Sequence, residues 1–139
     1  VATVLQGLSE AHRELGELAE AQALAERALA IAEKALAPDH PGVAQALGCL
    51  AEALLARQRP AEALPLAERA VAVDAARAGT DTGEPAVRYI LAQALVAAHG
   101  DRDRARAEAE LARDEFRSAG MAKELAEVEA WLARHTRGR

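Results

Sequence analysis

The sequence predicts an all-α protein built as an α-solenoid, a stack of helical hairpins. The chain has 139 residues, of which 38 are alanine, the residue with the highest helix propensity. The β-branched and aromatic residues that favour strands are scarce, and the aromatic residues are limited to Tyr89, Phe116 and Trp131. The third observation is an internal repeat, which sets the length of the stacked unit.

The repeat is seen when residues 1–42 are laid over residues 43–84 without gaps, which gives 16 identities. The agreement is densest from Leu24 to Ala28, which matches the segment from Leu66 to Ala70. Self-similarity with a period of roughly 20–50 residues is typical of solenoids. The period of 42 residues therefore predicts one pair of helices per unit.

Each of the first two units is predicted to form two helices joined by a short turn. Gly16 ends the first helix of unit one, since glycine adopts the positive φ that helix ends require. Pro60 fits the first turn of the second helix of unit two. Residues at helical spacing give each helix an apolar stripe. The stripes are Leu5, Leu8, Ala11, His12 and Leu15; Leu18, Ala21, Leu24, Ala25, Ala28 and Ile31; and Leu47, Leu50, Ala51 and Leu54.

The segments between units carry helix-breaking residues. Pro38-Asp39-His40-Pro41 supplies a breaker, a cap and a proline suited to the start of a helix. Residues 79–85 have the same role before a third pair of helices, whose turn is formed by residues 99–101. Alignment of Leu91 with Leu8 predicts that this third turn contains one extra residue.

A final helix is predicted after Gly120, with a charged face opposite an apolar one. Such a helix would cap the array, because the last unit of a stack otherwise exposes its apolar side. All three aromatic residues fall in the third pair and this cap, so we expect larger core side chains there. The apolar face carries Met121, Leu125, Val128 and Leu132, and the charged face carries Lys123, Glu124, Glu127, Glu129 and Arg134.

The paired pattern resembles the tetratricopeptide repeat family. The first helix of each unit has Leu-x-x-Leu, the turn of unit one has Gly, and the second helix has Ala-x-x-x-Ala-x-x-Ala. The 42-residue period and the linker from Pro38 to Ala44 resemble the kinesin light chain type of this repeat. The resemblance implies a right-handed superhelix with repeats at about residues 1–42, 43–84 and 85–118 and a capping helix at about 121–135.

The resemblance also implies a non-catalytic module that binds a peptide or partner protein in a concave groove. The ending, at residues 100–107 and 124–132, resembles the C-terminal repeats of bacterial serine/threonine protein kinases, so we expect a cytoplasmic signalling protein as the parent chain. The chain starts at Val1 within a predicted helix, which suggests a fragment of a longer protein. The alternative is a structural module that forms homodimers through exposed repeat edges.

In such an array, side chains of the first helices that lie off the core stripe face the groove. Glu10 and Glu52 recur one period apart, which favours a basic or amide-rich peptide as the ligand. The alternative for each of these residues is a solvated helix face. The family's clamp for a C-terminal carboxylate uses Lys, Asn and Arg, and this chain has no asparagine. The groove candidates are Gln6, Glu10, Arg13, Gln45, Glu52, Tyr89 and Gln93.

The composition and motifs argue against several other functions. A formal net charge of −5 disfavours nucleic acid or an anionic membrane as the partner. A single cysteine, Cys49, forms no internal disulfide, and we expect it to be a half-buried thiol. His12 has no second His or Cys at i+3 or i+4, so we expect a core histidine, with no metal site and no cofactor. Phosphate-binding and kinase motifs are absent, and we expect no catalysis.

Overall fold

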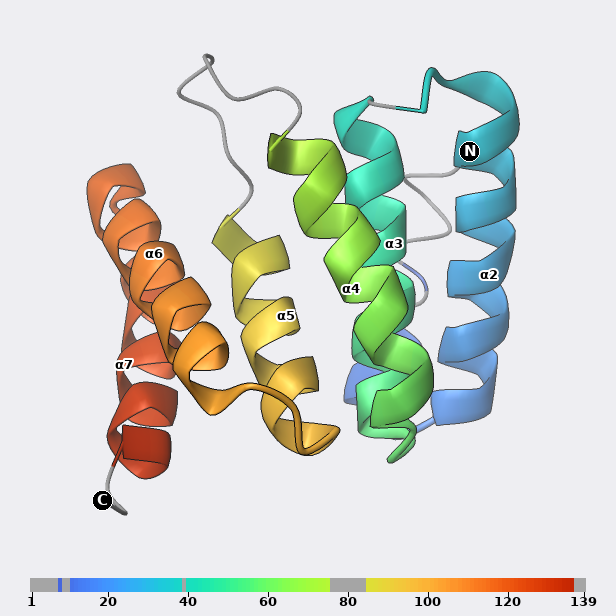
Figure 1. Ribbon diagram of the computed structural model, residues 1–139. Coiled ribbons are helices and arrows are strands. Elements are labelled where there is room, and N and C mark those ends of the chain that lie inside the picture. Colours follow the sequence, from blue (N-terminus) through green and yellow to red (C-terminus); the bar gives the residue numbers. More distant parts are fainter. Residues whose placement is uncertain (1–7, 9–10, 39, 76–84, 137–139) are drawn as a thin grey trace.

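The computed structural model describes residues 8, 11–38, 40–75 and 85–136. After a helical turn at residues 11–14, six helices follow, and Figure 1 shows them side by side in chain order. Within the described ranges the regular structure is helical and contains no strand. The six helices are α2 (Leu18–Ala35), α3 (Pro41–Ala56), α4 (Pro60–Ala75), α5 (Pro85–Ala97), α6 (Arg102–Ala119) and α7 (Ala122–Thr136).

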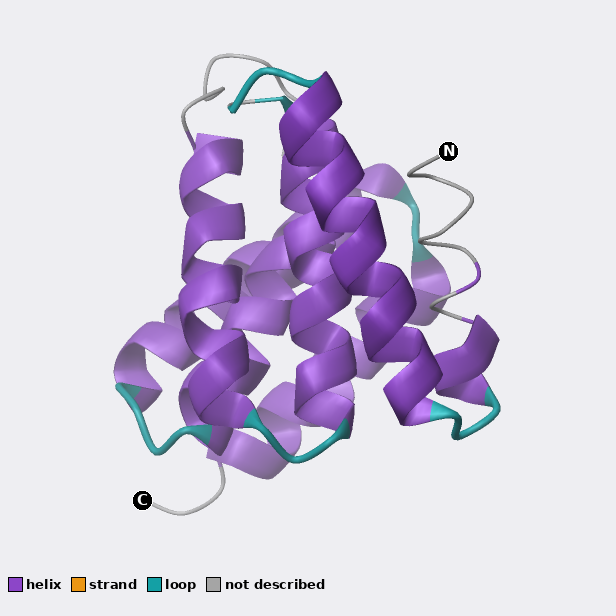
Figure 2. Cartoon of the chain, turned by 90° about the vertical axis from the view of Figure 1, so that its right-hand side faces the viewer, coloured by secondary structure: helices purple, strands orange, loops and turns teal. Residues whose placement is uncertain are grey.

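The helices form a solenoid in which each one packs on the next along the chain. Contacts join α2 to α3, α3 to α4, and so on to α6 and α7, and α3 also contacts α5 directly. The perpendicular view in Figure 2 shows the helices packed across more than one layer. The predicted fold class, an all-α solenoid of stacked hairpins, is confirmed. None of the described helices has the length and hydrophobicity that a membrane-spanning segment requires.

The helix boundaries follow local side-chain chemistry. Pro41 and Pro60 begin α3 and α4 as predicted, because a proline in the first turn has no amide hydrogen to leave unpaired. The cap of α3 is His40, whose Nδ1 accepts a hydrogen bond from the amide of Gly42 at 3.0 Å. Asp101 caps α6 in the same way, accepting from the amide of Arg104 at 3.0 Å.

The turns within the three hairpins share one backbone geometry. Gly16 has φ +80°, and the equivalent residues Gln58 and His99 have φ +62° and +58°. The left-handed residue of the third turn is thus His99 and not Gly100. His99 follows Gln58 by 41 residues, whereas the buried Ala105 follows the buried Ala63 by 42. The third turn therefore contains one extra residue, as the sequence predicted.

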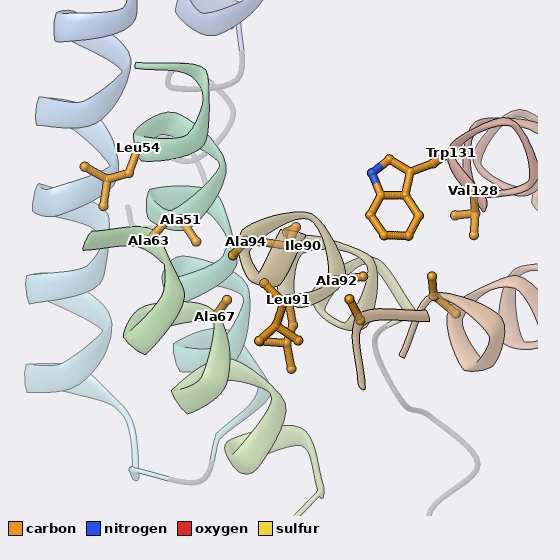
Figure 3. Close-up of a cluster of buried hydrophobic side chains, with 14 of the residues drawn as sticks. Ala51, Leu54, Ala63, Ala67, Ile90, Leu91, Ala92, Ala94, Val128 and Trp131 are labelled. Carbon is orange, nitrogen blue, oxygen red and sulfur yellow. The ribbon is translucent and has the colours of Figure 1, made fainter. Parts of the chain in front are cut away.

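Alanine makes up much of the core. Ala21, Ala25 and Ala28 of α2 have no exposed surface, and neither do their counterparts Ala63, Ala67 and Ala70 of α4. Small side chains at these contacts allow neighbouring helices to approach toward the close end of the usual range of about 8–10 Å. Figure 3 shows this alanine- and leucine-lined core around α3, α4 and α5, with Val128 and Trp131 of α7 beyond it. Phe116 is also buried, so the buried aromatic residues lie in the third pair and α7 as expected, although Leu47 and Val43 of α3 are also among the largest fully buried side chains.

The prediction of a buried apolar stripe on the first helix is wrong at its described positions, where Ala11 is also exposed. Leu8 is 45% exposed and Leu15 is 75% exposed, because Leu15 stands at the turn into α2. His12 is not a core histidine, since its side chain is 32% exposed and its Nδ1 pairs with a carboxylate oxygen of Glu17 beyond the turn. Leu5 lies outside the described residues.

Ion pairs join the second helices of the successive hairpins. Arg69 of α4 donates to Glu33 of α2 at 3.1 Å, and Arg104 of α6 donates to Glu68 of α4 at 2.9 Å. In each pair the acceptor precedes the arginine by 36 residues. All four side chains are more than two-fifths exposed, so each pair contributes little to stability but repeats the same register between hairpins.

Candidate peptide-binding groove

A large groove follows the first helices of the hairpins. It is lined mainly by α3, α5 and α7, together with Phe116 of α6 and with Arg13 and Glu14 of the helical turn before α2. Its volume is about 1150 Å³, which exceeds the roughly 300–1,000 Å³ typical of small-molecule pockets. A groove of this size, lined by several successive helices, can hold an extended chain segment.

The groove brings together five of the seven candidate residues. Arg13, Gln45, Glu52, Tyr89 and Gln93 all line it, although they come from three separate helical segments. The five are exposed or half-buried, so a ligand in the groove can reach them. The remaining candidates, Gln6 and Glu10, lie outside the described residues.

Sequence reasoning missed the contribution of α7 to the groove. Lys123, Glu124, Glu127, Trp131 and His135 line its far end, whereas the charged residues among them were assigned to the outer face of a cap. The order of helices along the sequence did indicate that the last helix lies on the groove. A helix that follows the second helix of a hairpin takes the place of a next first helix, and the first helices form the groove wall.

An aromatic cluster closes the groove where α5 meets α7. The ring of Tyr89 meets that of Trp131 edge-on, with centroids 6.0 Å apart and planes at 87°. The ring of His135 stacks on Trp131 at a centroid distance of 4.2 Å, and its Nδ1 lies 2.8 Å from the carbonyl oxygen of Trp131. Trp131 is buried, and its ring contact with the half-buried Tyr89 joins α7 to α5 and limits the movement of both rings.

The electrostatics of the groove are acidic around Tyr89. The pKa of Tyr89 is raised, first by burial and then by the charges of Glu127 and Glu52, while Arg134 acts in the opposite direction. The groove lining contains four glutamates, Glu14, Glu52, Glu124 and Glu127, and the cationic side chains Arg13 and Lys123. Negative charge therefore predominates among these groove-lining side chains.

The other residues considered for chemistry do not converge on a site. Cys49 is a half-buried thiol without a disulfide, as expected, and it lies on the groove wall. His12 pairs with Glu17, and His40 caps α3. Across the described ranges, His, Cys, Asp and Glu side chains form no group of three placed to hold a metal ion.

Comparison with known proteins identifies the architecture. The tetratricopeptide repeat family model matches residues 1–76, more than half of the chain. The chain belongs to the tetratricopeptide repeat family. Tetratricopeptide repeats are generally non-catalytic modules for protein–protein interaction. A comparison with curated protein sequences gave no match.

Solved structures of tetratricopeptide-like repeats share this fold. The chain is similar to a variant of a Podosopora anserina protein with nearly identical kinesin light chain TPR-like repeats, with 25% identity and a TM-score of 0.80 over 96% of this chain. The present chain spans 64% of the length of that Podosopora anserina chain. A second Podosopora anserina structure of this kind gives 22% identity and a TM-score of 0.71 over 99% of this chain and 76% of the other. The likeness to the kinesin light chain type of repeat is thus confirmed.

Proposed function

We propose that this tetratricopeptide repeat module holds an extended peptide or partner-protein segment in the groove formed by α3, α5 and α7. The observation that carries the proposal is the convergence of five separately predicted side chains on one groove of about 1150 Å³. Extended segments commonly dock on helical surfaces through a few side-chain anchors. In the same proposal, repeats at about 1–42, 43–84 and 85–118, with a cap at about 121–135, form one domain.

We also propose a setting for the module. The resemblance of the last two helices to the C-terminal repeats of bacterial serine/threonine kinases supports a regulatory or recruiting role in a cytoplasmic signalling protein. In that role the groove holds a partner while another part of the parent chain performs the signalling chemistry. The sequence of the complete gene tests this setting directly, since a kinase domain encoded in the same chain is the expected finding.

The groove is tested by blocking it. Peptides selected from a random library with the intact chain are expected to bind Gln45→Trp at least roughly tenfold more weakly, because an indole on α3 fills space in the groove. Ala61→Trp is the matched control, since Ala61 is exposed on α4 outside the groove, and it is expected to bind like the parent. Fluorescence polarisation measures both. Equal affinity for all three proteins would place the binding surface elsewhere.

A second candidate function is self-association through the edge formed by the first helical turn. The exposure of Leu8 and Leu15, at 45% and 75%, favours it, because a second copy of the chain would remove these large apolar side chains from water. This candidate predicts a mass that rises with concentration in light scattering, and an approach to monomer in the Leu15→Glu variant. A strict monomer at high micromolar concentration would exclude it.

A further inference from the structure

The most distinctive chemistry in the groove lies around Tyr89. Glu52 of α3, Tyr89 of α5 and Glu127 of α7 belong to three helices and lie up to 75 positions apart in the sequence, yet all three line the same groove. Both carboxylates are close enough to the phenol to act on it electrostatically. A half-buried aromatic ring that shares a groove with two carboxylates within electrostatic reach is suited to bind a cation, since the ring face and the negative charges both attract it.

We propose that this cluster is a subsite for a single lysine or arginine side chain of the bound segment. The inference rests on the proposed groove and names the chemistry of its occupant. Glu52 and Glu127 attract the cationic head from α3 and α7, and the ring of Tyr89 contacts its flat or methylene surface. Trp131 fixes the Tyr89 ring by its edge contact at 6.0 Å.

Charges of both signs surround the subsite. Arg134 of α7 opposes the two glutamates at Tyr89, and Lys123 of α7 and Arg13 also line the groove. Glu124 lines the groove on the same helix as Glu127, so carboxylates outnumber cations in the groove lining. The excess of negative charge in a concave site is strengthened by its partial exclusion of water. An anionic ligand segment is disfavoured at this position for the same reason.

The experiment uses two peptides, acetyl-Gly-Ala-Arg-Ala-Gly-amide and its counterpart with citrulline, which has the shape of arginine without its charge. Trp131 is the only tryptophan of the chain, so its emission reports binding next to Tyr89. The arginine peptide is expected to bind roughly fivefold or more tightly than the citrulline peptide, with a difference that shrinks at high salt. Glu127→Gln and Glu52→Gln are expected to remove most of that difference.

Glu129→Gln is the matched control, because Glu129 is an exposed glutamate of the same helix outside the groove lining. It is expected to keep the full preference for arginine. Equal binding of the two peptides, or a preference that survives in Glu127→Gln and Glu52→Gln, would overturn the subsite. If library peptides still bind in a way that Gln45→Trp blocks, the groove itself stands; if none binds, both proposals fail.

Discussion

The Trp131→Ala variant is expected to lose about 3–5 kcal/mol of stability, as is usual when a large buried aromatic side chain is removed. Trp131 is only 5% exposed and belongs to the same hydrophobic cluster as Val128, Leu132 and Phe116. It also contacts Tyr89 of α5, so the indole joins α7 to the preceding hairpin. Its loss leaves a cavity at that junction.

The Trp131→Ala variant is expected to unfold first in the helices next to the lost side chain. In a stacked repeat each unit contacts only its neighbours, so α7 and α6 should open before α2 and α3 do. Urea unfolding followed by circular dichroism measures the loss, and hydrogen exchange locates it. Arg134→Ala, at an exposed position of α7, is the control and should change little. Uniform exchange along the chain, or an unchanged midpoint, would contradict the role given to Trp131.

Deletion of residues 119–139 extends the same argument. It removes α7 and uncovers Phe116 and Tyr89, so we expect a melting temperature lower by roughly 10 °C or more and a less soluble protein. Differential scanning calorimetry measures the melting temperature. Unchanged melting and solubility in the truncated chain would argue against the proposed cap.

The sequence predicts the fold well because the repeat constrains every level of structure at once. The register of Ala21 with Ala63 placed small residues at helix contacts, and all the alanines so identified in α2 and α4 are fully buried. The prediction was weaker at the first helix. Periodicity gives the face on which Leu15 lies, but it does not say whether another helix covers that face, and Leu15 is 75% exposed.

Some of the side chains that the first helices contribute to the groove lining were predicted, and others, such as Glu14 and Ala86, were not. Glu52 and Gln93 follow from their place beside the core stripe. Glu127 and His135 were missed because α7 was treated as an outer cap, although it also closes one end of the groove. The grouping of Glu52 with Tyr89 and Glu127 depends on the curvature of the whole stack, which a one-dimensional pattern does not encode.

A partly buried ionic cluster between α5 and α6 was also missed, and it supports the second large prediction. Arg88 of α5 donates from Nη1 to Glu108 at 3.1 Å and from Nε to Glu115 at 3.2 Å. The three side chains are 21%, 15% and 33% exposed. Helical periodicity places an arginine at this position of α5 but gives no sign of which acidic residues of α6 it meets.

Arg88→Ala is expected to cost about 2–3 kcal/mol at neutral pH, because it leaves two partly buried carboxylates on one helix without their shared cation. The pKa of Arg88 is itself raised: burial alone would lower it, but the hydrogen bond to Glu108 and the charges of Glu115, Glu108 and Asp74 outweigh burial. Chemical denaturation of the parent and the variant measures the difference. Equal stability at neutral pH would show that the cluster contributes nothing.

The pH dependence of this loss has a definite sign. Burial raises the pKa of Glu115 above its ordinary value of 4.5 in spite of the opposing effect of Arg88, and one carboxylate oxygen, Oε2, has no hydrogen-bond partner. Because the pKa of Glu115 is raised in the folded state, protonated Glu115 stabilises the fold below pH 4.5. This stabilisation is lost as the pH rises through the folded-state pKa. The penalty of Arg88→Ala should therefore be smaller at about pH 4, where the raised pKa of Glu115 favours its neutral form, than at about pH 7.

Glu115→Gln separates charge from packing at the same position. Its amide keeps the shape of the side chain and can still accept a hydrogen bond from Arg88, but it removes the charge that burial disfavours. We expect this variant to be as stable as the parent or more stable at neutral pH, and to lose the part of the pH dependence that Glu115 contributes. If Glu115→Gln instead destabilises the protein as much as Arg88→Ala, the ion pair outweighs the cost of burying its carboxylate, and α5 and α6 are held together by charge as well as by their apolar contacts.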